Sequence, residues 1–198
     1  MDTALVAWSS RIENRIQTGE QYWDLACALR QIASALRPQN FLEIGVRLGK
    51  TSAMVAATAP EVSIAAFDLW ISPYAGVDNP GPDFVRQQLA GVGHTGELVF
   101  FSGDSRHTVP QYFAANPDRT FDIVNVDGDH SDEGAWVDLT NVAEYVAAGG
   151  YLLFDDLTNP QHTLLPVWRR FQVEYGDRFD FVENLKDHYG TGVARRRH

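Results

Sequence analysis

The stretch Ile123-Val124-Asn125-Val126-Asp127-Gly128-Asp129-His130 is a short apolar run that ends in acids, and Tyr151-Leu152-Leu153-Phe154-Asp155-Asp156 repeats the pattern. Runs of this kind are typical of strands buried on both faces of a parallel sheet. Ligands of open α/β sheets bind where such strands end, so we expect the acids to meet at one sheet edge. Like charges gathered there cost free energy unless a cation or a proton offsets them. The pattern therefore indicates a hard metal ion beside a reaction centre.

Outward from these two runs, apolar and helical stretches alternate along the chain. The apolar periodicity predicts strands over 41–45, 63–68, 98–101, 121–126 and 151–154. It predicts helices over 20–36, 51–58, 83–89, 109–115, 133–147 and 164–175. This alternation indicates an α/β fold in which helices cover both faces of a mainly parallel sheet. Two last strand-like stretches, 179–182 and 191–194, predict a hairpin with 186–190 in its turn.

Length and composition favour one compact domain over residues 1–198. The chain is 44% hydrophobic and 12% aromatic, which is enough for a sizeable core. We expect a helical segment over 1–37 and a Rossmann-like core over 38–198. The single cysteine, Cys27, excludes an internal disulfide and a thiolate metal cage. No signal peptide and no membrane-length apolar run is evident, so we expect a soluble, cytoplasmic protein without a membrane partner.

The net charge of −10 and the pI near 4.9 argue against nucleic acid as a partner, because phosphate binding relies on basic patches. We therefore expect a small molecule as the substrate. The oligomeric state stays open, although the helix before Pro38 could serve as a lid or as the face of a homo-oligomer. The irregular stretch 70–82 is rich in proline and glycine, which is typical of a lid, a binding loop or a passive surface loop.

A glycine-bearing turn follows the first predicted strand, in Glu43-Ile44-Gly45-Val46-Arg47-Leu48-Gly49-Lys50-Thr51. Glycines at such a turn let the backbone approach a ligand, and the next helix offers free N–H groups. The spacing E-x-G-x-x-x-G differs from the G-x-G-x-x-G of dinucleotide-binding folds and from the P-loop. A ligand with an ammonium or another polar group near Glu43 is therefore favoured over a pyrophosphate.

Two further positions extend this candidate cofactor site. Asp68 ends the second predicted strand about twenty residues after the turn, where a carboxylate can accept hydrogen bonds from a ribose diol. It could instead be a cap residue. Gly103-Asp104-Ser105 closes the third strand, where small polar residues could flank an adenine ring, although a simple turn explains them nearly as well.

Together, the glycine turn, Asp68, residues 126–130 and residues 149–156 resemble class I S-adenosylmethionine-dependent methyltransferases. More narrowly, they resemble metal-dependent O-methyltransferases of the catechol and caffeoyl-CoA type and of the macrolide and sugar type. The resemblance implies a doubly wound, seven-stranded mixed sheet, mostly parallel, whose last two strands form an antiparallel edge hairpin. It implies S-adenosyl-L-methionine and Mg²⁺ as cofactors.

The resemblance also implies a role for each motif. Gly45 and Gly49 would approach the methionine part of the cofactor, and Glu43 would help to hold its amino group. The ribose and adenine would lie by Asp68, Asp104 and Ser105. Magnesium would bind Asp127, Asp155 and Asp156, with Asp127 also counted among the cofactor-binding residues. The family often has Asp-Asn where this chain has Asp155-Asp156, and the extra charge should strengthen cation binding or leave one carboxylate free as a base.

The chemistry of magnesium agrees with this set, because Mg²⁺ prefers oxygen ligands and keeps sites for water or substrate. A cation lowers the pKa of a bound hydroxyl, and a nearby base then takes the proton. His130 is our first choice as base because histidine titrates near neutral pH, and Asp129 is the alternative. Asp129 could instead contact a helix start, and His130 could merely support the loop. A sugar, a macrolide or a catechol-like diol would suit such a site.

Three other functions remain open from the sequence. Some relatives with this motif set are described as cephalosporin-hydroxylase-like, and a non-haem iron oxygenase normally uses two histidines and one carboxylate. The six histidines are scattered without a paired spacing, which disfavours that class and, with the lone cysteine, structural zinc. An NAD-dependent oxidoreductase is disfavoured by the missing G-x-G-x-x-G. A non-catalytic cofactor-binding module is the third alternative.

Overall fold

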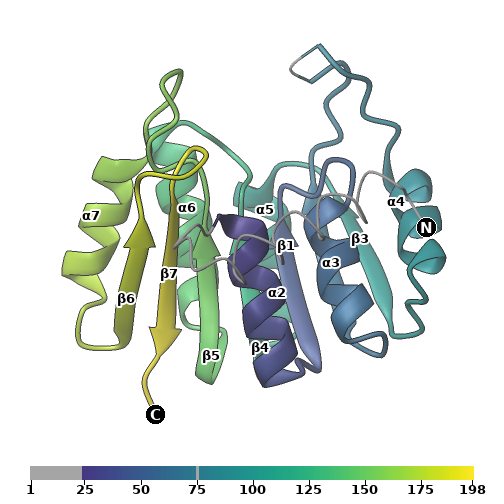
Figure 1. The fold of residues 1–198 in the computed structure, drawn as a ribbon, viewed down its shortest axis with the longest axis horizontal. Helices are drawn as coiled ribbons and strands as arrows, with labels where there is room; N and C mark the ends of the chain where they lie inside the picture. Colours follow the sequence, from purple (N-terminus) through teal and green to yellow (C-terminus); the bar gives the residue numbers. More distant parts are fainter. Residues whose placement is uncertain (1–23, 75) are drawn as a thin grey trace, which may run out of the picture.

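The computed structural model describes residues 24–74 and 76–198, and these form one seven-stranded sheet in the order β3-β2-β1-β4-β5-β7-β6 (Figure 1). The first five strands are parallel, and β7 runs antiparallel to both of its neighbours, β5 and β6. This confirms the predicted mixed sheet and its C-terminal hairpin. The strands are β1 (Asn40–Ile44), β2 (Ser63–Asp68), β3 (Leu98–Ser102), β4 (Phe121–Val126), β5 (Val146–Phe154), β6 (Phe179–Asn184) and β7 (Thr191–Arg196).

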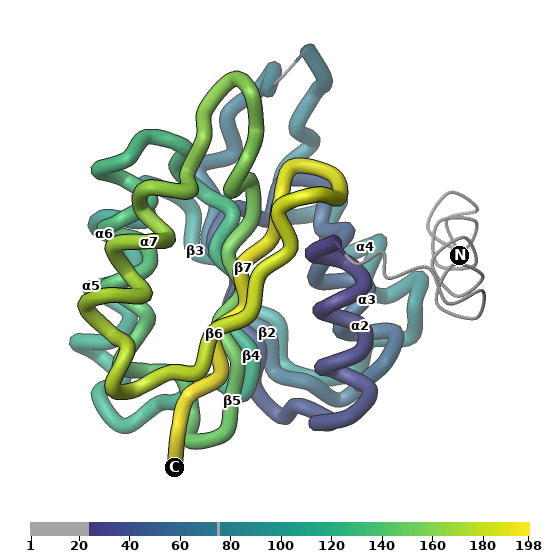
Figure 2. The backbone as a smooth tube through the Cα atoms, turned by 60° about the vertical axis from the view of Figure 1, so that its left-hand side comes forward, coloured from purple at the N-terminus to yellow at the C-terminus, as the bar shows by residue number. Residues whose placement is uncertain are grey.

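Helices cover both faces of the sheet, as Figure 2 shows. One face carries α2 (Leu25–Leu36), α3 (Lys50–Thr58) and α4 (Pro82–Gly91). The other face carries α5 (Ser105–Ala115), α6 (Asp132–Ala143) and α7 (Leu165–Glu174). The predicted helix 20–36 begins within the described residues at Leu25, where Asp24 caps it, and residues 20–23 lie outside them. The fold is the doubly wound, three-layer arrangement that the sequence predicts.

Two separate apolar cores explain why the central strands are apolar on both faces. Successive side chains of a strand point to opposite faces, so neighbours in sequence enter different cores. In β5, Leu152 packs with the core under α5, α6 and α7, and Leu153 packs with the core under α2, α3 and α4. In β4, Val124 and Ile123 divide in the same way. The unbroken apolar runs are therefore a direct consequence of burial on both sides.

Three predicted boundaries are wrong by four or five residues. The helix predicted over 133–147 ends at Ala143, and β5 begins at Val146, five residues earlier than expected. The apolar stretch after Ala143 fits a helix by local preference, but Val146 pairs with Phe121 of β4, and this tertiary pairing wins. The helix predicted from 109 begins at Ser105, because the side chain of Asp104 accepts a hydrogen bond from the Arg106 N–H and caps the first turn.

The loops that follow β1, β2, β4 and β5 gather at one end of the sheet, and the C-terminus lies at the other end (Figure 1). Parallel strands place their carboxyl ends together, so this end of the sheet carries the glycine turn, Asp68 and both acidic strand ends. Among the described residues, no helix is both long enough and apolar enough to cross a membrane.

Candidate active site

The glycine turn is held against the end of β4 by very close packing. Gly45 has φ of 87°, and a Cβ atom there would lie 1.8 Å from the carbonyl oxygen of Asp127. Gly49 has φ of 71°, and its Cβ would lie 2.6 Å from Cγ1 of Val85. Both positions therefore require glycine for the packing of the chain itself. Their predicted approach to a methionine moiety stays a prediction.

Glu43 lies beneath this turn and is fully buried. Three donors surround its carboxylate, namely the hydroxyls of Thr51 and Ser52 and, at 2.9 Å, Nδ2 of Asn125. Burial raises the pKa of Glu43 to about 7, and these donors oppose the rise. These three side chains of the protein itself hydrogen-bond the carboxylate, so Glu43 links β1, β4 and the start of α3. Its contact with a ligand amino group stays a prediction.

Asp68 lies beside the same turn, as the sequence predicts. Its Oδ2 accepts a hydrogen bond from the Arg47 N–H at 2.7 Å, and its Oδ1 accepts one from the Trp70 N–H at 2.5 Å. Each carboxylate oxygen can accept a further hydrogen bond. The cap interpretation and the ribose interpretation are thus compatible, since Asp68 orders both loops and keeps acceptor capacity.

Asp104 and Ser105 lie at the end of β3, two strands away from β1. Asp104 caps α5 and forms an ion pair with Arg106, with 2.6 Å between Oδ2 and Nη2. The Arg106 hydrogen bond lowers the pKa of Asp104 to about 2. Ser105 is the first residue of α5, and the buried acid Asp138 of α6, which no motif in the sequence marks, accepts a hydrogen bond from the Asp129 N–H at 3.4 Å. The turn explanation is confirmed for Asp104, and an adenine contact stays a prediction.

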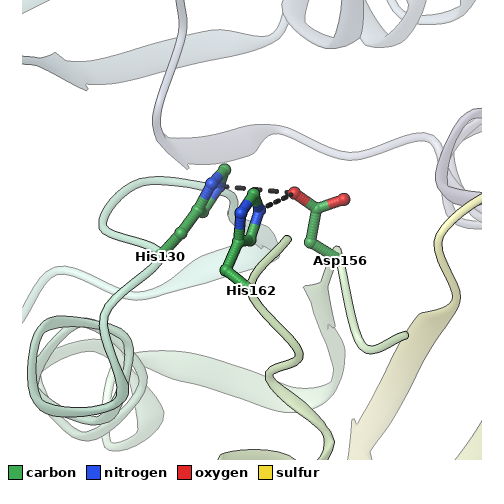
Figure 3. A group of neighbouring side chains, drawn as sticks. All are labelled: His130, Asp156 and His162. Carbon is green, nitrogen blue, oxygen red and sulfur yellow. Dashed lines mark hydrogen bonds and ion pairs between the residues drawn. The ribbon is translucent and has the colours of Figure 1, made fainter. Parts of the chain in front are cut away.

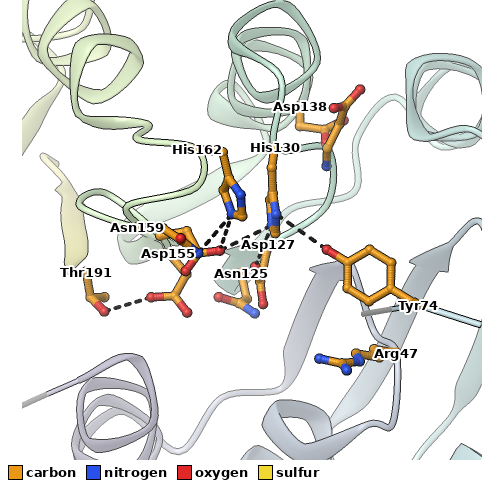
Figure 4. A network of polar contacts seen from close by, with 12 residues as sticks. Arg47, Tyr74, Asn125, Asp127, His130, Asp138, Asp155, Asn159, His162 and Thr191 are labelled. Atoms are coloured by element: carbon orange, nitrogen blue, oxygen red, sulfur yellow. Dashed lines mark hydrogen bonds and ion pairs between the residues drawn. The ribbon is translucent and has the colours of Figure 1, made fainter. Parts of the chain in front are cut away.

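The three acids predicted to bind metal follow two neighbouring strand ends, Asp127 after β4 and Asp155 and Asp156 after β5, and Figure 4 labels the first two. The Asp155 N–H donates to the carbonyl of Val126, which fixes the two strand ends side by side. Burial, and then the charges of Asp127 and Asp156, raise the pKa of Asp155 well above its ordinary value. Burial also raises the pKa of Asp127, partly offset by His130. Burial and like charges both favour the neutral form of a carboxyl group.

His130 joins this acidic cluster and brings a second histidine with it. Its Nε2 lies 3.3 Å from Asp127 Oδ1 and 3.6 Å from Asp156 Oδ2. His162 places its own Nε2 2.9 Å from the same Asp156 oxygen, and the two imidazole rings stack with centroids 4.2 Å apart (Figure 3). The expectation of scattered, unpaired histidines is therefore wrong. His162 follows Asp156 by six residues in a loop that turns back, a placement that no periodic pattern reveals.

Asp129, the alternative base, points away from this cluster. Its Oδ1 accepts a hydrogen bond from the Ser131 N–H at 2.8 Å. Its carboxylate also fills the space above Gly134, where a Cβ would lie 2.0 Å from Oδ2. Asp129 thus supports the start of α6, which is the other role that the sequence left open. His130 is the better placed of the two candidates.

The loop between β2 and α4 reaches the site through Tyr74. The Tyr74 hydroxyl lies 3.4 Å from Nδ1 of His130, and Cζ of Arg47 lies 5.1 Å from the centre of the tyrosine ring (Figure 4). The glycine turn, the long loop and the histidine are thereby joined in one constellation. This stretch is therefore more than a passive surface loop.

Among the described residues, one group of side chains could share a divalent cation, and of the three predicted acids it contains Asp156 alone. Asp127 lies beside His130, and Asp155 accepts a hydrogen bond from Thr191, so their predicted part in metal binding stays a prediction. Ligating atoms of His130, Asp156 and His162 all lie within 4.8 Å of one another. Oxygen ligands suit Mg²⁺, and imidazole nitrogens suit first-row transition metals.

A family model described as a methyltransferase domain matches residues 42–157, more than half of the chain. None of the curated protein sequences matches. The apo structure of CalS11, a TDP-rhamnose 3′-O-methyltransferase of calicheamicin biosynthesis, is 23% identical with a TM-score of 0.64; the match covers 86% of this chain and 76% of CalS11.

Two structures with a bound cofactor or product share this fold. TomG from Streptomyces achromogenes, an O-methyltransferase of tomaymycin synthesis in complex with S-adenosylmethionine, is 18% identical with a TM-score of 0.67, and the match covers 100% of this chain and 91% of TomG. The methyltransferase PaMTH1 from Podospora anserina, bound to S-adenosylhomocysteine, is 15% identical with a TM-score of 0.65, and the match covers 100% and 89%.

The matched residues 42–157 run from β1 to the acids after β5. They include the glycine turn, Asp68 and both acidic strand ends. The chain therefore belongs to the methyltransferase-domain family and has the Rossmann-like fold of class I S-adenosylmethionine-dependent methyltransferases.

Proposed function

We propose that the protein transfers a methyl group from S-adenosylmethionine to a hydroxyl of a small molecule, with the help of a divalent cation. One observation carries the proposal: a glycine turn with Asp68 and an acidic cluster with His130 share one end of the sheet. The first pair of features suits a nucleoside donor. The second suits an acceptor oxygen that must lose a proton.

On the donor side, the strand ends β1 and β2 offer the groups that the cofactor needs. Asp68 keeps acceptor capacity for a ribose diol, and the turn after β1 brings the start of α3 toward the ligand. Buried Glu43 holds that turn through the hydroxyls of Thr51 and Ser52. S-adenosylmethionine, when bound, supplies the electrophilic methyl group.

On the acceptor side, Asp127, Asp155 and Asp156 would hold the cation. A bound divalent cation supplies Lewis acidity, which lowers the pKa of a substrate hydroxyl. Thr191 donates to Asp155 at 3.0 Å and fixes the orientation of that carboxylate. Two adjacent hydroxyls on a sugar or a catechol-like ring would match such a site.

His130 takes the hydroxyl proton in this proposal. Burial alone would lower the pKa of His130, but the hydrogen bond and charge of Asp127, with the charges of Asp156 and Asp155, raise it overall. Nε2 lies 3.3 Å from Asp127 Oδ1, beside the carboxylates that would hold the cation. The Tyr74 hydroxyl near Nδ1 helps to orient the ring. Holding the oxygen and the methyl group in line supplies much of the remaining rate gain.

The acceptor class is inferred from charge and from the neighbours. The acidic chain disfavours a nucleic-acid acceptor. CalS11 is described as acting on TDP-rhamnose, and TomG as acting in tomaymycin synthesis. We therefore favour a sugar or a small aromatic alcohol with neighbouring hydroxyls.

A methyl-transfer assay tests the proposal. Labelled S-adenosylmethionine is incubated with a panel of nucleotide sugars, macrolides and catechols, with and without EDTA. We expect label on at least one hydroxylated acceptor, its loss in EDTA and its return with Mg²⁺ or Mn²⁺. Transfer that continues unchanged in excess chelator would reject the cation site.

A second candidate, a non-haem iron oxygenase, gains support from one observation. His130, His162 and Asp156 form the two-His-one-carboxylate set that this class uses. The methyltransferase proposal stays first because an oxygenase gives no role to the glycine turn or to Asp68. Oxygen uptake by the Fe²⁺-loaded protein with the same acceptor panel, in the absence of S-adenosylmethionine, discriminates between the two.

A further inference from the structure

We propose that His162 is a direct metal ligand, and that it makes the cation site select a first-row transition metal such as Mn²⁺, Fe²⁺, Co²⁺ or Zn²⁺ over Mg²⁺. The proposal rests on the cation site of the proposed function. It adds a nitrogen ligand to the three carboxylates that the sequence predicts. It also assigns a role to a histidine that the methyl transfer itself does not use.

The first support is the spacing of the donor atoms. Atoms bound at about 2.1 Å from one ion lie about 3.0 Å apart in an octahedron and about 3.4 Å apart in a tetrahedron. His162 Nε2 and Asp156 Oδ2 are 2.9 Å apart. This separation matches the edge between two ligands of one octahedral ion.

The second support is a hydrogen-bonding conflict at Nε2 of His162. Its Nε2 lies 3.0 Å from Asn159 Nδ2, a donor, and 2.9 Å from Asp156 Oδ2, an acceptor. Asn159 Oδ1 accepts from the Gln161 N–H, which fixes the amide orientation. A ring nitrogen carries either a proton or a lone pair, so it cannot satisfy both neighbours. With the lone pair on Nε2, two acceptors face each other, and a cation beside both stabilises that pair.

The third support is the rigid frame behind the two residues. Asp156 is only 8% exposed, and its carbonyl accepts hydrogen bonds from the N–H groups of Asn159 and Leu164. Leu165 donates to the carbonyl of Leu157 and closes the same loop. These hydrogen bonds turn the loop back on itself, so that His162 faces Asp156. A loop fixed in this way presents a preformed pair of ligands and not a chance surface contact.

Ligand chemistry then sets the choice of ion. Magnesium prefers oxygen and gains little from imidazole, whereas affinity for nitrogen rises from Mn²⁺ through Fe²⁺ to Co²⁺. One imidazole ligand added to the carboxylates therefore raises the affinity for these transition metals more than the affinity for Mg²⁺. His130, which lies 3.6 Å from the same Asp156 oxygen, remains available as the base.

The test is calorimetric titration of the full-length, metal-free protein with Co²⁺ and with Mg²⁺, in the absence of S-adenosylmethionine. We expect the wild type to bind Co²⁺ about a hundredfold or more tighter than Mg²⁺. His162→Gln replaces the nitrogen by an amide oxygen, which Mg²⁺ accepts. This variant should lose about tenfold or more in Co²⁺ affinity and change little in Mg²⁺ affinity, with a shift of the visible Co²⁺ absorption bands.

The matched control is His198→Gln, because His198 is exposed at the far end of the sheet (Figure 1). It should leave both affinities unchanged. Equal losses of Co²⁺ and Mg²⁺ in His162→Gln, or no loss, would overturn the proposal, since a supporting residue would not alter the ratio of the two ions. A wild-type ratio near unity would overturn it without any variant.

Binding of S-adenosylhomocysteine to His162→Gln, measured without metal, reports separately on the fold and on the donor site. Retained binding with an unchanged ion ratio contradicts the His162 proposal alone. Absent binding in the wild type contradicts the methyltransferase proposal and leaves the metal result to be judged by itself.

Discussion

At the scale of single residues, the surroundings of each acid decide its role. Glu43, fully buried, is surrounded by donors of the chain and holds the turn. Asp129 is turned toward the start of α6. Asp127 lies beside His130, and Asp155 accepts a hydrogen bond from Thr191. Burial, and then neighbouring charges, raise the pKa of both carboxyl groups. The acids that look alike in sequence therefore divide into structural and reactive groups.

The pKa of Glu43 gives a stability prediction. Because burial raises this pKa from 4.5 to about 7, the folded protein keeps a proton that the unfolded chain releases. The contribution of protonated Glu43 to the free energy of unfolding is fully present below pH 4.5. It is lost as the pH rises to 7, and this loss amounts to about 3 kcal/mol. Glu43→Gln does not titrate. Urea unfolding in half-unit pH steps should show the wild type losing about 3 kcal/mol relative to the variant, and parallel curves would contradict this.

The role of His130 gives a kinetic prediction. His130→Gln removes the base and should lower kcat by about 10² to 10⁴-fold, which is typical for loss of general-base catalysis. Affinity for S-adenosylhomocysteine should stay unchanged, because Asp68 and the glycine turn bind the donor. His94→Gln is the control, since His94 contacts the Val62 carbonyl before the start of β2. Full activity of His130→Gln would reject the assigned base.

At the scale of elements, the strand ends could be predicted from the sequence and the returning loops could not. Apolar runs that stop at Asp68, Asp127 and Asp155 mark the carboxyl ends of parallel strands, and period and burial suffice to find them. His162 lies in a loop held by backbone bonds to Asp156 and Leu157, and such bonds leave no periodic signal. The end of α6 was missed for a related reason, because pairing with β4 overrides local helix preference.

The packing of the glycine turn gives a prediction at this scale. Gly45→Ala places a Cβ against the Asp127 carbonyl at a left-handed φ, so we expect a loss of several kcal/mol in the free energy of unfolding. Gly91→Ala is the matched control, because nothing lies within 4 Å of that Cβ and the residue ends α4. The control should be neutral or more stable by up to about 1 kcal/mol. Similar urea midpoints for both variants would contradict the close approach of β1 and β4.

At the scale of the whole molecule, the fold brings two half-sites to one end of a sheet. The turn after β1 and the end of β2 form the donor side, and the ends of β4 and β5 form the acceptor side. The two sides share the turn that Gly45 packs against Asp127. The central claim is that these sides bind different ligands, the cofactor on one and the cation on the other.

Calorimetric titration with S-adenosylhomocysteine, compared between the wild type, Asp68→Ala and Asp155→Asn, tests this claim most directly. Loss of a charged hydrogen-bond acceptor for the ribose should weaken binding to Asp68→Ala by about tenfold or more. Asp155→Asn should bind S-adenosylhomocysteine like the wild type and lose divalent-cation affinity. No binding to the wild type, or a loss in Asp155→Asn with Asp68→Ala unaffected, would contradict the division of the site.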